Sequence, residues 1–200
     1  MLSEVERSRV EAAVRLAEER TAGEIVVVLA RRAGAYKSVP LAAGLLAALA
    51  TPWPLILLSE LPAARIFALQ LGAACLGIAA ASWAGMRIVP RFVRQDRARA
   101  AAAREFAHRG MADTRGRTGV LLYVAVAEHY AEVVGDLAVS AKVSGLEWRG
   151  VIEALQVAMA EGRTADALVA AVAAIGDILA RHAPPGEGDP DELPNRLVLL

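Results

Sequence analysis

The chain has 200 residues, and its 22 basic and 22 acidic residues leave no net charge at neutral pH. This balance argues against a polycationic nucleic-acid-binding protein, so we predict no nucleic-acid partner. The single cysteine, Cys75, excludes an intrachain disulfide, and the three histidines form no zinc-binding pattern with it. Hydrophobic residues make up 56% of the chain, whereas ordinary soluble domains have roughly 45–50%. The excess must be concentrated in particular segments.

Residues 1–37 are predicted to begin a soluble α/β domain. Residues 2–20 place apolar side chains at helical spacing among many charges, which is typical of an amphipathic helix that covers a surface. Residues 21–23 end this helix, and residues 24–30 form a β-branched run of strand length. The polar character of the first ten residues predicts no cleavable signal peptide.

Residues 38–87 are predicted to form a transmembrane helical hairpin with spans at about 39–59 and 63–86. Residues 38–59 and 66–86 hold no charged side chain, and at about 1.5 Å per residue each run can cross a hydrocarbon layer of about 30 Å. Pro52 and Pro54 interrupt the first span, so the sequence does not determine the residue at which this span ends. A buried helical hairpin in a soluble core is the alternative, which two such long uncharged runs disfavour.

Small residues recur at every fourth position of the second span, at Ala73, Gly77, Ala81 and Gly85. Such a face lets another helix approach closely. The first span is the obvious partner, and a second copy of the chain or another protein is the alternative. The interior of each span holds no acidic, basic or histidine side chain, so we do not expect the hairpin alone to transport ions or protons.

Basic side chains flank the two spans, at residues 31, 32 and 37 and again from 87 to 99, whereas the loop between the spans has only Arg65. By the positive-inside rule, both termini and the soluble domain are predicted to face the cytoplasm. Arg87, Arg91 and Arg94 are candidates for contact with anionic lipid head groups. Their use as a topology signal is the simpler interpretation.

Residues 88–183 are predicted to complete the soluble domain, followed by an extended tail at 184–200. A polar helix at 98–110 precedes a strand at 120–127, whose lack of polar alternation is typical of a central strand buried on both faces. A third strand is predicted at 130–139, and helices at 148–160 and 165–182, with Thr164 as an N-cap. The last residues, 197–200, are expected to dock back onto the domain.

The predicted fold class is therefore α/β, with a small central β-sheet flanked by helices and interrupted after its first strand by the hairpin. Three segments of the soluble part resemble the TPM-domain family: TAGEIVVV at 21–28, RTGVLLYV at 117–124 and EHYAEVVGD at 128–136. Residues 162–178 are similar to the family's final helix. The order of segments resembles the family's bacterial membrane-protein branch, which implies an α/β sandwich at the bacterial cytoplasmic (inner) membrane.

This resemblance also implies an activity, because relatives include a thylakoid-lumen protein described as an acid phosphatase involved in photosystem repair. Relatives often carry Asp-Asn-Gly before the second strand, a plausible metal-binding element. This chain has Arg117, Thr118 and Gly119 there. The departure weakens the expectation of calcium binding and of phosphatase activity.

Four carboxylates, those of Glu24, Asp113, Glu128 and Asp136, stand at predicted strand ends or turns, where α/β domains usually place ligands. They are candidate ligands of a divalent cation, the only cofactor that the sequence suggests. Ordinary solvated strand ends explain them equally well. His129 can act as a base, but no Ser or Cys has a recognised nucleophile context, so no catalytic residue is assigned.

Two classes of function remain. The first is a membrane-tethered interaction or assembly module, which the missing catalytic motifs favour. The second is a divalent-cation-assisted phosphatase, which rests on the family resemblance.

Overall fold

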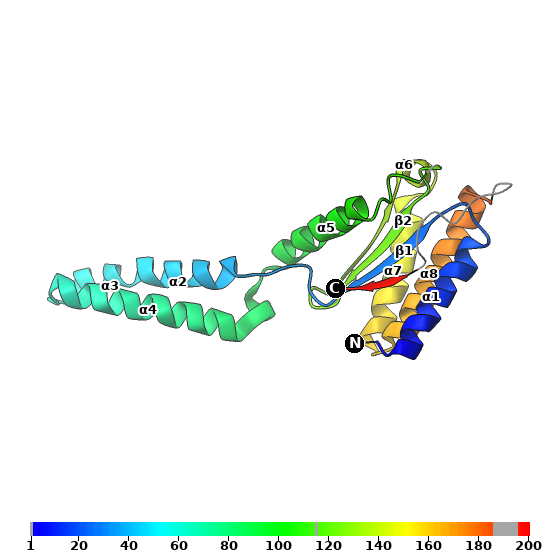
Figure 1. The fold of residues 1–200 in the computed structure, drawn as a ribbon. Coiled ribbons are helices and arrows are strands. Elements are labelled where there is room, and N and C mark those ends of the chain that lie inside the picture. Colours follow the sequence, from blue (N-terminus) through cyan, green and yellow to red (C-terminus); the bar gives the residue numbers. More distant parts are fainter. Residues whose placement is uncertain (1, 115, 186–195) are drawn as a thin grey trace. The chain divides into compact units, whose positions relative to one another are not determined.

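The computed structural model describes residues 2–114, 116–185 and 196–200, and these fall into two compact units (Figure 1). One unit joins Met1–Ala33 with Gln95–Leu200, and the other is Gly34–Arg94. The predicted hairpin at 38–87 lies inside the second unit. The first unit, called the soluble unit below, is therefore built from chain on both sides of the hairpin.

A four-stranded sheet forms the centre of the soluble unit, in the order β3-β2-β1-β4. Strands β1 (Ile25–Ala30), β2 (Val120–Ala125) and β4 (Leu197–Leu199) run parallel, and β3 (Tyr130–Gly135) is antiparallel to β2. Ile25 pairs with Val120 and Ala30 with Ala125, so the strand before the hairpin lies in register with the first strand after it. The mixed α/β fold with a small central sheet is confirmed.

Three helices cover one face of this sheet: α1 (Glu4–Glu18), α7 (Gly145–Ala160) and α8 (Thr164–His182). Alternate residues of β1 and β2 pack with them in one hydrophobic core. Capping boxes begin α1 and α7, where Ser3 pairs with Glu6 and Ser144 with Glu147. Each box satisfies two backbone N–H groups that the first helical turn leaves without a partner.

Helix α5 (Arg91–His108) covers the opposite face of the sheet, as Figure 1 shows. Its buried alanines Ala98, Ala101 and Ala102 let the helix approach the other side chains of β1 and β2. Burial within this second core raises the pKa of the Tyr123 hydroxyl to about 12. Every residue of β1 and β2 is buried, so the prediction of a central strand without polar alternation is confirmed.

The third strand is shorter than the predicted range of 130–139. It ends at Gly135, and the following residues form the short helix α6 (Leu137–Ser140), with Asp136 at its N-cap. The chain turns here because the Asp136 N–H donates to Gly119 O at 2.8 Å and Ser140 Oγ donates to Gly135 O. A local pattern of apolar residues does not reveal such a turn.

Two smaller predictions concern the C-terminal part. Thr164 is the first residue of α8, and Arg163 occupies the N-cap position instead. The predicted docking of the last residues is confirmed, because β4 pairs with β1. Most of the predicted extended segment, residues 186–195, lies outside the described residues.

The second unit is an antiparallel pair of apolar helical arms. Helices α2 (Ser38–Ala50) and α3 (Pro52–Leu58) form the first arm, and α4 (Ala63–Ala84) with the 3-10 helix η1 (Gly85–Ile88) forms the second. The first arm is interrupted at Thr51, whose Oγ1 donates to Ala47 O, and Pro52 begins α3. The prolines thus interrupt the helix where the sequence predicts it.

Glycines bring α2 and α4 together. A Cβ atom placed on Gly77 would lie 3.1 Å from Ala43 O and 3.1 Å from the Cα of Gly44. On Gly44, a Cβ would lie 2.9 Å from Ala74 O. The small-residue face of the second arm therefore packs against α2 at Gly77, and its use by a second copy of the chain remains a prediction.

Replacing Gly77 by Leu should loosen this helical pair, because overpacking of such a contact costs roughly 1–3 kcal/mol. Gly72 is the matched control, since a Cβ there meets nothing within 4 Å. Hydrogen exchange of the full chain in mild detergent, followed by mass spectrometry, should be at least about fivefold faster across α2 and α4 in Gly77→Leu. Equal exchange in Gly77→Leu and Gly72→Leu would contradict the packing.

Candidate functional site

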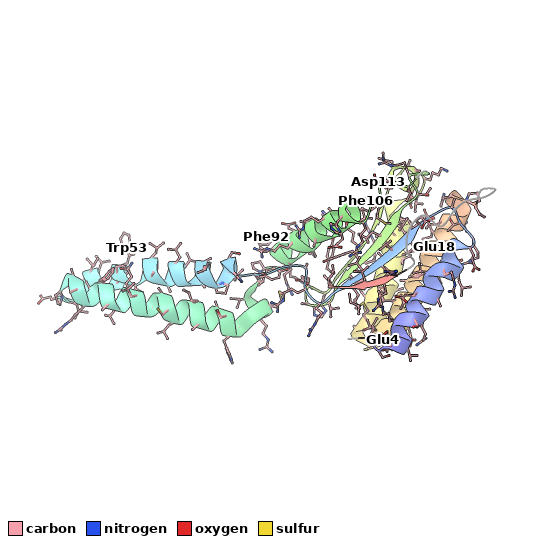
Figure 2. The ribbon with its side chains drawn as sticks, in the orientation of Figure 1. Glu4, Glu18, Trp53, Phe92, Phe106 and Asp113 are labelled. Atoms are coloured by element: carbon pink, nitrogen blue, oxygen red, sulfur yellow. The ribbon has the colours of Figure 1, made fainter. Side chains whose placement is uncertain are left out.

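The amino ends of β1 and β2 lie beside the carboxyl end of β3 at one end of the sheet, which is called the Arg117 edge below. Val120 pairs with Ile25 on one side and with Gly135 on the other. Glu24 and Asp136 therefore stand at this edge, next to Gly119. Figure 2 shows Asp113 on the segment that follows α5, at the same end of the soluble unit as α6.

Arg117 binds Asp136 with two hydrogen bonds at this edge. Arg117 Nε donates to one carboxylate oxygen at 2.6 Å, and Nη2 donates to the other at 3.0 Å. Asp136 is only 5% exposed. The hydrogen bond to Asp136 raises the pKa of Arg117, with smaller Coulombic contributions from Asp136 and Asp113. A guanidinium therefore supplies the positive charge that a buried carboxylate needs, in the planar geometry that suits it.

The segment that carries Arg117 is held by contacts to both halves of the soluble unit. Arg117 itself has a positive φ of 52°, and its carbonyl accepts the N–H of Ala138. Thr118 Oγ1 donates to Ala22 O at 2.7 Å, and its N–H donates to Thr114 Oγ1. The bond from Thr118 to Ala22 joins the chain after the hairpin to the chain before it, and together these bonds hold the backbone that carries the Arg117 side chain.

Gly119 is required by this close packing. A Cβ atom at this residue would lie 2.4 Å from Met111 O, which is closer than any real contact. The chain therefore passes directly beneath the preceding loop before it enters β2. This is a steric reason for the glycine that involves no ligand.

Glu24 and Asp113 are two further acidic residues at this edge. Glu24 is buried, and its carbonyl accepts the N–H of Val120 at 2.7 Å. The Asp113 N–H donates to Gly110 O at 2.8 Å, which closes the turn after α5. The backbone roles of both residues are structural.

Glu128 lies at the opposite end of the sheet, in the turn between β2 and β3. Its carboxylate accepts the N–H of Ala33 at 3.0 Å and holds the chain just after β1. His129 follows with a positive φ of 51° and an exposed side chain.

The four candidate carboxylates therefore do not converge on one point. Among residues 2–114, 116–185 and 196–200, no three or more His, Cys, Asp or Glu side chains are grouped so that they can hold a metal ion. Both oxygens of Asp136 are already bound by Arg117. This donor set does not fit a divalent cation, which needs several free oxygen ligands.

The three arginines proposed to contact lipid lie at the end of the second arm. Arg87 belongs to η1, and Arg91 and Arg94 to the first turn of α5. Arg87 and Arg91 are exposed. Their contact with lipid head groups stays a prediction.

A cavity of about 490 Å³ lies at the other end of the sheet, beyond the carboxyl ends of β1 and β4. Its lining is mostly apolar, with Leu29, Val126 and Leu199 among its residues, and Arg31 and Thr164 add polar groups. The carboxyl ends of parallel strands are the usual place for ligands in α/β folds. Sequence reasoning missed this cavity because its walls come from residues far apart in the chain.

Sequence reasoning also missed the pairing of Arg117 with Asp136. The family resemblance implies one signal for it, because Asp-Asn-Gly is expected at the positions where this chain has Arg117, Thr118 and Gly119. A basic residue next to a strand end with a buried acidic neighbour is a candidate ion pair.

Arg117→Asn should destabilise the folded chain, because Asn tolerates a positive φ and so removes only the ion pair. The buried Asp136 carboxylate then loses its cation, and we expect the melting temperature in mild detergent to fall by at least about 3 °C. The double variant Arg117→Asn/Asp136→Asn should recover part of this loss, since it leaves no buried charge. Strictly additive effects of the two substitutions would contradict the pairing.

Comparison with known proteins is consistent with this fold. Residues 86–178 match the family model of the TPM domain. The solution structure of the BA42 protein from the psychrophilic bacterium Bizionia argentinensis is similar, with a TM-score of 0.63 and 22% identity over 100% of this chain and 96% of that one. At this identity the similarity concerns the fold alone, and no curated protein matches the chain. The resemblance in the sequence is thus confirmed, and the chain carries a TPM domain.

Proposed function

We propose that the chain is a membrane-tethered protein whose TPM domain works as an interaction or assembly module at the cytoplasmic face of the bacterial inner membrane. The hairpin would hold the domain at the membrane. The domain would supply binding surfaces and no chemical step of its own.

The exposed apolar surface of the hairpin carries this proposal. Ser38–Leu58 and Ala63–Ile88 have 21 and 26 residues, and only 6% of the most apolar stretch of each is buried. Trp53, labelled in Figure 2, is 71% exposed, and Leu58 and Trp83 are 85% and 91% exposed. A helix of a soluble core would bury such side chains. In a bilayer the same side chains face hydrocarbon or the interface.

The charges around the hairpin support a cytoplasmic domain. Arg31, Arg32 and Lys37 precede the first arm, and arginines follow the second, whereas Arg65 alone lies near the loop. By the positive-inside rule, such a bias favours flanks on the cytoplasmic side. The domain, which holds the chain on both sides of the hairpin, would share that side.

The edge of the sheet with Arg117 and Asp136 supports a binding module over a cation-assisted phosphatase. Phosphoryl chemistry with a divalent cation needs carboxylate oxygens that are free to bind metal. Here Arg117 binds both Asp136 oxygens, and Glu128 lies at the far end of the sheet.

Membrane insertion can be tested with the full chain. We expect it to stay in the membrane pellet after alkaline carbonate extraction. Leu45→Asp/Leu76→Asp should release or aggregate the protein, because each charged residue at a span centre costs roughly 2.5–3.5 kcal/mol. Both leucines are exposed.

Leu146→Asp is the matched control, since Leu146 is an exposed leucine of α7 in the soluble unit, and it should leave the protein in the pellet. A cytoplasmic reporter fused after Leu200 should be active and a periplasmic reporter silent. The reverse pattern would overturn the orientation, and full extraction of the wild-type chain by carbonate would overturn the tether.

The phosphatase alternative has its own measurement. We expect the purified full chain to hydrolyse a generic phosphomonoester no faster than Asp113→Ala/Asp136→Ala does, with magnesium or calcium present. Cation-dependent hydrolysis that this double variant loses would establish the phosphatase and refute a purely binding role.

A further inference from the structure

Strand β4 forms an open edge of the sheet. It pairs with β1, and the strand order leaves its other side without a described strand. Leu200 donates its N–H to Leu29 O and accepts the N–H of Arg31. Because a parallel strand directs the backbone groups of alternate residues to alternate sides, those of Leu197 and Leu199 face away from β1.

One of these edge groups already binds a carboxylate. The N–H of Leu197 donates to Glu11 Oε1 of α1 at 3.2 Å. Leu197 is only 1% exposed, so its backbone is covered, whereas Leu199 is 38% exposed and directs both of its backbone groups to this side. An extended segment lying along β4 can form backbone hydrogen bonds with them.

A groove of about 530 Å³ lies along this edge. Val26 and Val198 form an apolar part of its lining. Around them stand basic side chains: Arg7 of α1, His108 at the end of α5, Arg109 just after it, and Arg196 just before β4. The helices α1 and α5 lie on opposite faces of the sheet, so arginine side chains stand on both sides of the strand edge.

Two of these arginines already bind acidic neighbours. Arg7 Nε donates to Glu11 at 3.1 Å, and Arg109 Nε donates to Glu105 at 3.0 Å. A guanidinium has five donors, so each of the two retains donors for another carboxylate. Together with Arg196 there are three guanidinium groups and only two glutamate carboxylates, so one positive charge is left over. None of the described side chains that line the groove is acidic.

We propose that this groove, the β4 edge groove, binds an acidic extended peptide segment of a partner protein by strand addition to β4. The proposal rests on the proposed role as an interaction module, and it specifies the surface and the chemistry of the partner. Backbone pairing with Leu199 fixes the register of the peptide. The basic side chains select acidic residues, and Val26 with Val198 accepts a β-branched side chain between them.

Basic side chains at a strand edge have another use, because they discourage aggregation through that edge. Protection of the strand edge from aggregation requires only charged side chains. The β4 edge groove combines charge on both faces, an apolar lining and outward backbone groups. The two explanations differ in what they predict for a peptide with acidic side chains and a strand-forming centre.

The test uses the full chain purified in mild detergent and a fluorescent peptide of sequence DEVTVED. We expect saturable binding, measured as an increase in fluorescence anisotropy. Two control peptides separate the contribution of charge from that of strand pairing. KRVTVRK reverses the charge, and DEVPVED keeps the charge but interrupts the strand and removes a backbone donor. Both should bind at least about tenfold more weakly.

Two variants of the protein test the surface. Arg196→Glu should weaken binding of DEVTVED at least about tenfold, whereas Arg149→Glu, the same change on an exposed part of α7, should not alter it. Leu199→Pro removes a backbone donor that faces the peptide and leaves the bonds between β4 and β1 in place. It should abolish binding without lowering the melting temperature.

The chain's own acidic residues 187, 189, 191 and 192 stand close to Arg196 in the sequence and could compete with the peptide. The assay is therefore repeated with these four residues changed to their amides, and tighter binding there supports the groove. Absence of binding by both proteins, equal binding of DEVPVED, or equal effects of Arg196→Glu and Arg149→Glu would overturn the proposal. These outcomes do not depend on carbonate extraction or on the reporter, so failure of the groove is distinguishable from failure of the membrane tether.

Discussion

The parallel pairing of β1 with β2 is the interaction on which the rest of the soluble unit depends. These strands lie on opposite sides of the hairpin in the sequence, yet they pair in register from Ile25–Val120 to Ala30–Ala125. Both are buried on both faces, and each fully buried Val, Leu or Ile contributes about 1.5–3 kcal/mol. Neither half of the domain can bury this surface alone. The hairpin is therefore an insertion within one fold.

This pairing explains where the polar residues of the soluble unit gather. The segments that lead into β1 and β2 must meet at one edge, and Thr118 binds Ala22 across that edge. Arg117 then binds the buried Asp136 from the end of β3. An ion pair of this kind gives the edge a fixed structure without a bound ion. A free set of carboxylates in the same place would repel one another unless a cation bound them.

The open side of β4 has a different character, because this short strand forms the edge of the sheet. Arg7, Arg109 and Arg196 stand beside β4, whereas Glu24, Asp113 and Asp136 stand at the Arg117 edge. The soluble unit thus presents different chemistry at different edges of one sheet. That separation suits a domain that holds itself together at one edge and binds at another.

Local signals along the chain are enough to predict the uncharged runs of the hairpin, the interruption at Pro52, the buried strands β1 and β2, and the amphipathic helix α1. Hydrophobic length and periodicity depend only on neighbouring residues, so they can be read along the chain. Only the tertiary structure shows that Glu128 lies far from Asp136, that Arg117 neutralises Asp136, and that β4 exposes an edge beside Arg7 and Arg109. Each of these depends on strand order and on contacts between distant residues, which no local pattern encodes.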